Sequence, residues 1–177
     1  MTEGDQGALD GFSCGNAELD SFLREDTIAR EREGLLRTYL AFDQTTILGY
    51  ASVLVDVLRL DPAEGDRAGI GTTKYPIPAL KVARLGVTAD LQRGGAGTLL
   101  MQYALTRLFE VSDVAGCRFL VVDAKLETKA EGFYQRLGFE RNLARPHVNN
   151  KHAVSMRFDP FVEGAPTWVN DAGEVIV

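Results

Sequence analysis

The feature that most constrains the fold is a glycine-rich turn between a strand-like segment and a helix-like segment. An apolar strand pattern ends at Val87, and apolar residues recur at helical spacing from Leu99 to about Asp113. The turn between them contains Gly94, Gly95 and Gly97. A helix that starts from such a turn leaves backbone N–H groups unpaired at the positive end of its dipole, and glycine lets a phosphate approach closely. The pattern predicts an anion cradle, with a plain tight turn as the structural alternative.

Two common nucleotide-binding turns do not fit this segment. A Walker loop ends in Gly-Lys-Ser/Thr, whereas Gly97 is followed by Thr98 and Leu99. A Rossmann turn belongs to an early βαβ unit, whereas this turn lies in the middle of the chain, after a predicted helix and hairpin. Nucleoside triphosphatase and dinucleotide-binding functions are therefore disfavoured.

Composition narrows the class of protein further. The chain has 177 residues, 45% of them hydrophobic, which suits one domain with one core. Its 25 acidic and 19 basic residues give a net charge of −6, which argues against nucleic-acid binding through the whole surface. No apolar stretch is long enough to span a membrane, and the first ten residues do not resemble a secretory signal. Two cysteines and two histidines make neither a disulfide framework nor a zinc site, so we expect a cytoplasmic protein with no metal centre.

Periodicity predicts the remaining elements as a mixed α/β single domain. We expect a helix over 16–32, a hairpin of strands 35–42 and 47–60, and a long surface loop over 61–78. A buried strand follows at 119–122. Thr128 and Glu131 have the spacing of a capping box for a short helix that Gly138 closes, and Val154, Met156 and Phe158 alternate as a last strand.

Two segments carry a family resemblance. Gln92, Gly95 and Gly97 match the Gln/Arg-x-x-Gly-x-Gly/Ala loop of the GNAT superfamily of N-acetyltransferases, and 130–139 resembles that family's Ala-x-x-Phe-Tyr-x-x-x-Gly-Phe segment. The resemblance covers about 35–158. It implies a single GNAT-like domain over 1–160, with a central mixed, mostly antiparallel sheet flanked by helices. Residues 161–177 form a C-terminal tail beyond this core, whose β-branched end could add an edge strand within the chain or across a homodimer, or remain loose.

The resemblance also implies acetyl-CoA as cosubstrate and assigns the residues that bind it. Backbone N–H groups of the loop would hold the pyrophosphate, and the Leu85 and Val87 N–H groups would hold the acetyl carbonyl and the pantetheine arm. The loop residues are Gln92 at the entry, then Arg93, Gly94, Gly95, Ala96, Gly97 and Thr98.

The resemblance makes Tyr134 the catalytic residue, because a phenol can protonate the leaving thiolate of coenzyme A. A buried aromatic residue beside Phe133 is the structural alternative. Asp56, Asp123 and Glu127 are candidates for a general base, but each is read as a strand-end or loop carboxylate, and none is assigned.

A narrower resemblance concerns the N-terminal region. Segments 12–23, 76–78 and 83–87 are similar to the acetyltransferase toxins of bacterial toxin-antitoxin pairs, which acetylate the amino group of aminoacyl-tRNA. The resemblance implies an aminoacyl-tRNA acceptor and a ribbon-helix-helix antitoxin. The loop before Pro76 carries only Arg67 and Lys74 as basic residues. A small amine, a protein amine and a CoA-binding sensor without turnover remain as alternatives.

The two cysteines and a run of basic residues receive no catalytic role. Cys14 and Cys117 lie on no matching motif and are read as structural thiols. A basic run is read as a solvated edge, with a docking face for a phosphate-bearing substrate as the alternative. Its members are Arg136, Arg141, Arg145, Lys151 and Arg157.

Overall fold

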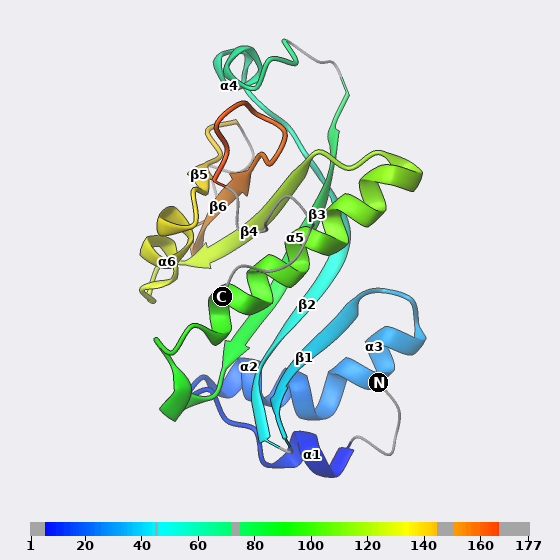
Figure 1. Ribbon diagram of the computed structural model, residues 1–177, viewed down its shortest axis with the longest axis vertical. Coiled ribbons are helices and arrows are strands. Elements are labelled where there is room, and N and C mark those ends of the chain that lie inside the picture. The colour runs from blue at the N-terminus through cyan, green and yellow to red at the C-terminus, as the bar shows by residue number, and fades with distance from the viewer. Residues whose placement is uncertain (1–5, 45, 72–74, 145–150, 167–177) are drawn as a thin grey trace. The chain divides into compact units, whose positions relative to one another are not determined.

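The computed structural model describes residues 6–44, 46–71, 75–144 and 151–166. Six strands form a sheet in the order β1-β2-β3-β4-β6-β5 (Figure 1). The helical elements are α1 (Gln6–Asp10), α2 (Ala17–Ser21), the π-helical turn η2 (Phe22–Asp26), α3 (Thr27–Arg32), α4 (Pro62–Arg67), the 3₁₀ turn η3 (Ala89–Leu91), α5 (Ala96–Ala115) and α6 (Ala130–Arg136). The strands are β1 (Arg37–Asp43), β2 (Thr46–Leu58), β3 (Ile77–Val87), β4 (Phe119–Lys125), β5 (Glu140–Arg141) and β6 (Ala153–Phe158).

The backbone divides into two compact units. The first comprises the described parts of 1–54 together with 82–104, and the second comprises the described parts of 55–81 and 105–176. The expected mixed α/β fold with a mostly antiparallel sheet is confirmed, since β1 pairs with β2, and β6 with both β4 and β5, in antiparallel orientation. In the described ranges, no helix combines the length and the apolar character that a membrane span requires.

The first unit begins with the predicted helical segment. Asn16 caps α2 by accepting hydrogen bonds from the backbone N–H groups of Glu18 and Leu19, and Gly34 ends the segment with φ of +72°. The helix is not uniformly α-helical, because η2 interrupts it as one π-helical turn. The segment and the hairpin enclose a core of buried side chains, among them Phe12, Leu23 and Tyr50.

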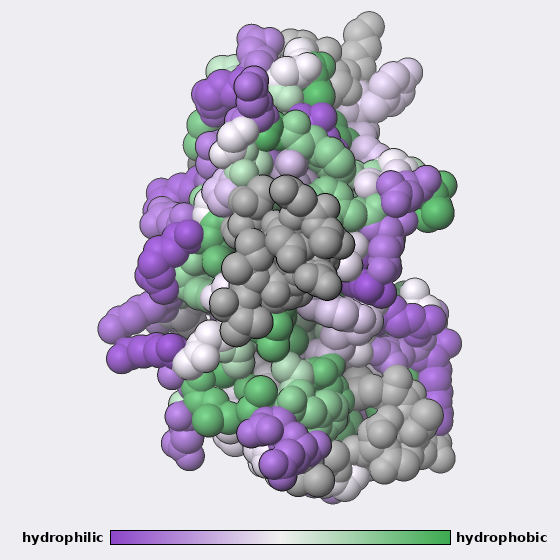
Figure 2. Space-filling view, in the orientation of Figure 1, coloured by the Kyte–Doolittle hydropathy of each residue, from purple (hydrophilic) through white to green (hydrophobic). Residues whose placement is uncertain are grey.

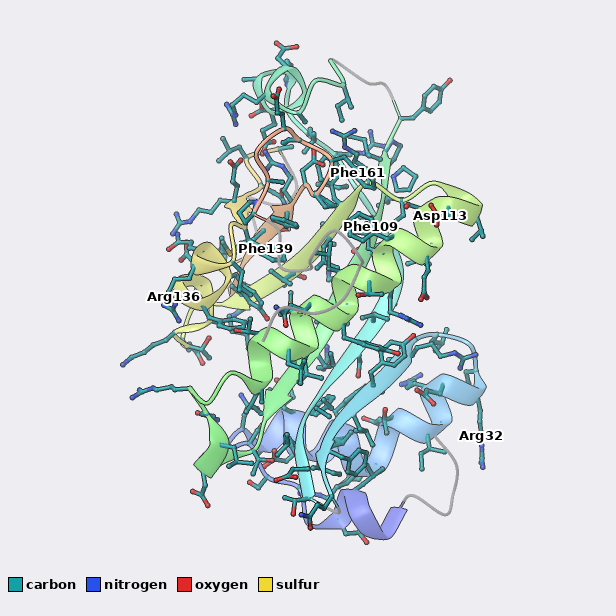
Figure 3. All side chains as sticks on the ribbon, in the orientation of Figure 1. Arg32, Phe109, Asp113, Arg136, Phe139 and Phe161 are labelled. Atoms are coloured by element: carbon teal, nitrogen blue, oxygen red, sulfur yellow. The ribbon has the colours of Figure 1, made fainter. Side chains whose placement is uncertain are left out.

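The second unit has its own core, in which Phe119 and Val121 of β4 are buried together with Leu58 and Ala79. Beside it, Phe109 of α5 and Phe161 meet edge to face at 5.7 Å between ring centroids (Figure 3). The unit also contains a buried ion pair between Glu64, which is fully buried, and Arg157.

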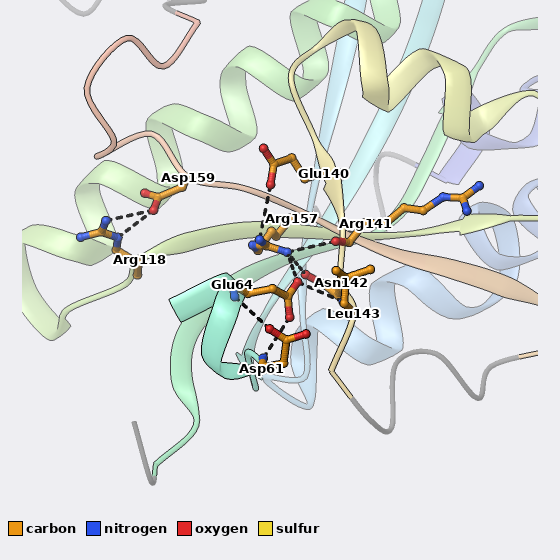
Figure 4. Close-up of polar contacts among 9 residues, drawn as sticks. All are labelled: Asp61, Glu64, Arg118, Glu140, Arg141, Asn142, Leu143, Arg157 and Asp159. Atoms are coloured by element: carbon orange, nitrogen blue, oxygen red, sulfur yellow. Dashed lines mark hydrogen bonds and ion pairs between the residues drawn. The ribbon is translucent and has the colours of Figure 1, made fainter. Parts of the chain in front are cut away.

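The ion pair sits in a satisfied hydrogen-bond network (Figure 4). Arg157 Nη1 donates to Glu64 Oε1 at 2.5 Å and to Asn142 Oδ1 at 3.0 Å. The Leu143 N–H donates to the same Glu64 oxygen at 3.0 Å, and the Asp61 N–H donates to Glu64 Oε2 at 3.0 Å. Glu64 thereby fastens α4 to β6 and to the segment after β5, since a buried charge requires such partners.

The structure corrects four expectations. Residues 61–78 are not one surface loop, because Asp61 and Glu64 form a capping box that starts α4, and β3 already begins at Ile77. The capping box expected from Thr128 and Glu131 does not form, because Lys129 is the N-cap and the Glu131 carboxylate pairs with Arg141.

The other two corrections concern β6 and the basic run. The predicted last strand is confirmed as β6, but its apolar alternation does not separate a buried face from an exposed one, since five of its six residues are buried. Arg157 cannot belong to a solvated basic edge, because its side chain is inside the second unit on Glu64. Within the tail, 161–166 contains turns and a bend but no strand, and the β-branched end that could form an edge strand lies outside the described residues.

Candidate active site

The turn after β3 is anchored at its start to two other segments of the first unit. The Thr88 N–H donates to the carbonyl of Leu48 at 2.9 Å, and the Thr88 hydroxyl donates to the carbonyl of Ile47 at 2.5 Å. The Ala89 N–H donates to the carbonyl of Ser13 at 3.0 Å. These bonds fix where the chain leaves the sheet and therefore where the glycine turn begins.

Gln92 holds the turn from its own side chain. Its Nε2 donates to the carbonyl of Cys14 at 2.9 Å and to the carbonyl of Val87 at 3.3 Å. The amide group therefore ties the loop entry to the end of β3 and to the N-terminal segment. Sequence reasoning placed Gln92 at the loop entry, and the structure shows what its side chain does there.

The backbone of the turn enters the left-handed region twice, at Arg93 with φ of +68° and at Gly95 with φ of +94°. This conformation is unfavourable for a residue with a Cβ, which explains a glycine at position 95. A Cβ on Gly94 would lie 3.1 Å from the Leu91 carbonyl oxygen, a tight contact that would require the turn to shift by a few tenths of an ångström.

The start of α5 presents N–H groups with no partner inside the helix. The first intrahelical bond runs from the Leu99 N–H to the Gly95 carbonyl at 3.0 Å, so the N–H groups of Ala96, Gly97 and Thr98 precede it. A Cβ built on Gly95 meets open space, and the first turn of α5 contains no acidic residue. Open space, outward N–H groups and the helix dipole together make a site suited to an anion.

Apolar surface lies beside this anion site. Leu91 and Leu99 flank the turn, and each is 38% exposed. Hydrophobic side chains also come to the surface of the first unit in the space-filling view (Figure 2). The turn thus suits a ligand that joins a phosphate group to an apolar arm.

Two glycines allow close packing around the part of β3 that contains the half-buried Leu85 and Val87. A Cβ on Gly86 would lie 2.6 Å from the Tyr50 ring, and one on Gly49 would lie 2.6 Å from the Gly86 carbonyl oxygen. Any larger residue at either position would displace the strand whose N–H groups are expected to bind the acetyl carbonyl.

Tyr134 lies in the second unit, on α6, with 7% of its surface exposed. Its ring contacts Phe133 at 5.2 Å and Phe139 at 5.5 Å between centroids. The helix closes as predicted: Gly138 has φ of +85°, and the Phe139 N–H bonds to the Tyr134 carbonyl at 3.0 Å.

The Tyr134 hydroxyl is held in its protonated form. Burial raises its pKa far above the usual value, and the negative charge of Asp123 raises it further. The hydroxyl donates to no group within the described ranges. A protonated phenol that donates to none of the described residues is available as a proton donor to a ligand.

Two of the three candidate bases are already engaged. Lys81 Nζ lies 2.6 Å from Asp123 Oδ2 and 3.5 Å from Asp56 Oδ2. Burial acts to lower the pKa of Lys81, but the hydrogen bond and charge of Asp123, together with Asp56, raise it overall. Glu127 is exposed in the turn after β4. Lys81 interrupts an otherwise apolar strand, which is the signal by which sequence reasoning could have found this cluster.

Both cysteines are buried and carry free thiols. Burial raises the pKa of Cys14 to about 11, and Asp20 contributes to the rise. Burial also raises the pKa of Cys117. Neither thiol is thiolate at neutral pH, so the geometry favours structural roles for both, as predicted.

The basic run is divided between surface and interior. Arg136, Arg141 and Lys151 are exposed, with Arg141 paired to Glu131, whereas Arg157 is buried. Arg145 lies outside the described residues.

Comparison with known proteins defines the class. Residues 9–139 match the model of the Acetyltransferase (GNAT) family, and the chain belongs to this family. It is therefore an acyltransferase by descent, as the two sequence motifs indicated.

Among individual proteins, the chain is similar to acetylating toxins. It is 29% identical over 136 residues to the tRNA-acetylating toxin of Mycobacterium tuberculosis (strain ATCC 25618 / H37Rv), a match that covers 76% of this chain and 80% of that protein. The structure of AtaT complexed with acetyl-methionyl-tRNAfMet is 26% identical, with a TM-score of 0.69, over 83% of this chain and 85% of AtaT. A tyrosine-to-phenylalanine variant of AtaT, bound to the C-terminus of the antitoxin AtaR and acetyl-CoA, is also 26% identical, with a TM-score of 0.65, over 84% of each chain.

Proposed function

We propose that this protein transfers the acetyl group of acetyl-CoA directly to a primary amine, and that the amine belongs to an aminoacyl-tRNA. The observation that carries the proposal is the turn from Gln92 to Thr98, with two left-handed residues and outward N–H groups at the start of α5. Family membership and the acetyl-CoA bound to AtaT support the same cosubstrate.

The residues present fit acetyl-CoA, which supplies an activated acetyl thioester when bound. The N–H groups of Ala96, Gly97 and Thr98 hold the diphosphate, together with the turn that precedes them. The N–H groups of Leu85 and Val87 orient the thioester carbonyl and polarise it. The apolar surface of Leu91 and Leu99 suits the pantetheine arm.

Tyr134 acts as the general acid. The neutral amine forms the new C–N bond as the C–S bond breaks, Tyr134 donates its hydroxyl proton to the leaving sulfur, and water takes the proton that the amine loses. Because burial raises its pKa, the hydroxyl carries its proton at neutral pH before the reaction begins. Lys81 already binds two of the three carboxylates considered as bases, which supports water as the proton acceptor.

The acceptor is inferred from the relatives. A tRNA-acetylating toxin and AtaT complexed with acetyl-methionyl-tRNAfMet are both similar to this chain over most of their length. An antitoxin neutralises the protein, as is supported by the binding of AtaT to the antitoxin AtaR. The proposal that this antitoxin is of the ribbon-helix-helix type, that the protein is a homodimer and that it works in the cytoplasm rests on the sequence alone.

The test is expression of the wild-type protein and of a Tyr134→Phe variant in bacterial cells, followed by mass spectrometry of RNA, protein and small amines. We expect N-acetyl-aminoacyl-tRNA in cells with the wild-type protein and at least tenfold less with the variant. An added acetyl group on a protein or a small amine, with none on tRNA, would transfer the assignment to that acceptor. Tight acetyl-CoA binding with no acetylated product in any fraction would identify a sensor.

A further inference from the structure

Arg84 is an arginine in the first unit whose donors are almost all unused. Its Nη1 donates to the carbonyl of Ala83, the residue before it, at 2.9 Å. Its Nε is buried and has no hydrogen-bond partner in the part of the chain that the structure describes. A guanidinium has five N–H donors, and buried donors are normally satisfied, so this one requires an explanation.

The guanidinium is nevertheless held in a defined place. It lies over the ring of Phe22 at 5.0 Å from the centroid, and Phe22 is the first residue of the π-helical turn η2. Stacking on an aromatic ring occupies the face of the guanidinium plane and leaves its edge, where the N–H groups point, open to a planar or tetrahedral anion.

One carboxylate lies near that edge at ion-pair distance but makes no hydrogen bond to it. Glu18 Oε1 is 3.9 Å from Arg84 Nη2, which is beyond hydrogen-bond distance. The two side chains are 57% and 36% exposed, so the pair is open to solvent. A ligand anion with better geometry can replace Glu18, because an exposed ion pair of this kind is weak.

The position of Arg84 on β3 determines which side of the sheet its side chain occupies. Arg84 directly precedes Leu85, and it projects to the side of the strand where Phe22 and Glu18 lie. Arg84 and Gly86 are two positions apart on β3, so they project to the same side of the sheet. A Cβ on Gly86 would face Tyr50 and Phe12, whereas a Cβ on Gly49 would face Leu100 of α5. The arginine is therefore on the side away from α5, whose N-terminus is the proposed diphosphate site.

We propose that Arg84 binds a backbone phosphate at the single-stranded end of the acceptor tRNA and so places the aminoacyl group next to the thioester. This inference rests on the proposed function and names the residue that reads its acceptor. The ligand is an anion that arrives with the acceptor, because the cofactor phosphates are bound on the other side of β3. A phosphate oxygen on the free edge would satisfy the unused donors in the bidentate manner that arginine favours.

The test compares four proteins with charged tRNA as substrate: the wild type, Arg84→Met, Glu18→Gln and the control Arg30→Met. Arg30 is an exposed arginine on α3 in the same unit, and it forms an ion pair with Glu33, which directly follows that helix. The readouts are kcat and KM for charged tRNA over a range of salt concentrations, the affinity for acetyl-CoA, and the thermal unfolding midpoint.

We expect Arg84→Met to raise KM for charged tRNA about tenfold or more, with acetyl-CoA affinity unchanged. The slope of log(kcat/KM) against log salt should become shallower by about 0.7, the contribution of one single-stranded phosphate. Glu18→Gln should lower KM, because it removes the competing carboxylate, and Arg30→Met should change neither quantity.

Two results would overturn the inference. An unchanged salt slope in Arg84→Met, with any loss confined to kcat or to thermal stability, would show that Arg84 only packs on Phe22. An equal loss of acetyl-CoA affinity would place its ligand on the cofactor. Failure of the wild-type protein to acetylate charged tRNA is a different outcome, since it overturns the proposed function and removes the assigned ligand with it.

Discussion

The anion site at the start of α5 predicts that one substitution will change stability and cofactor affinity in opposite directions. Ala96 is the first helical residue, and no acidic residue occupies the first turn. A glutamate at this position interacts favourably with the helix dipole and should stabilise the protein by about 0.5 kcal/mol. Because one helical turn rises by about 5 Å, we use that distance between this carboxylate and a diphosphate bound to the following N–H groups.

The cost to binding follows from Coulomb's law. Two ligand charges about 5 Å from one carboxylate, at an effective dielectric constant of about 40 to 80, are repelled by about 2 to 3 kcal/mol. Ala96→Glu should therefore bind acetyl-CoA about 30- to 150-fold more weakly than Ala96→Gln, which has the same shape without the charge. Position 96 is a better probe than Gly95, where φ of +94° would strain any substitution.

Isothermal titration calorimetry gives the two affinities, and thermal unfolding gives the stabilities. The reasoning requires the glutamate variant to be at least as stable as the glutamine variant and much the weaker binder. Equal affinity for acetyl-CoA in the two variants would refute it and leave the turn as a structural connection. A glutamate variant that is less stable would show instead that the substitution damages the fold.

Three further predictions concern single side chains. Tyr134→Phe should slow acetyl transfer about 100-fold or more, while acetyl-CoA affinity and the unfolding midpoint change little, because the hydroxyl bonds to none of the described residues. Equal turnover in steady-state kinetics would exclude Tyr134 as the acid. Glu64→Gln should lower the free energy of unfolding by about 3 to 5 kcal/mol, because it removes the buried carboxylate that faces Arg157 and leaves the exposed Glu140 as its remaining ion-pair partner. Adding Arg157→Met should restore most of the loss in urea denaturation, and no recovery would contradict the network. Burial raises the pKa of Cys14 from 9.0 to about 11, so the contribution of its neutral thiol to stability should be complete below pH 9 and decline as the pH rises towards 11. The stability of a Cys14→Ala variant should decline less over this pH range, and identical pH profiles of the two proteins would contradict the prediction.

The elements that sequence predicted are those whose signals are local. The spacing of apolar residues predicts the helix that begins at Asn16, and the glycines predict both the turn before α5 and the close of α6 at Gly138. α4 was missed because Pro62 and Gly65 were read as loop residues. The Asp61 and Glu64 pair three positions apart was the available capping signal.

The missed parts of the site depend on contacts between distant segments. Arg157 looks like a surface residue until Glu64 is brought beside it by α4, and the Lys81 cluster requires three strands to lie side by side. Arg84 stacks on Phe22, a residue 62 positions earlier in the chain. Charges that interrupt an apolar strand pattern mark such positions, but local periodicity does not identify their partners.

The most direct test of the proposed function uses the purified protein, isotopically labelled acetyl-CoA and a pool of charged tRNA. After nuclease digestion, mass spectrometry should find the labelled acetyl group on the α-amino nitrogen of aminoacyl-adenosine, with one coenzyme A thiol released for each acetyl group transferred. The product should fall about 100-fold with Tyr134→Phe. Labelled acetyl on a small amine or a protein amine, with none on any charged tRNA, would contradict the account.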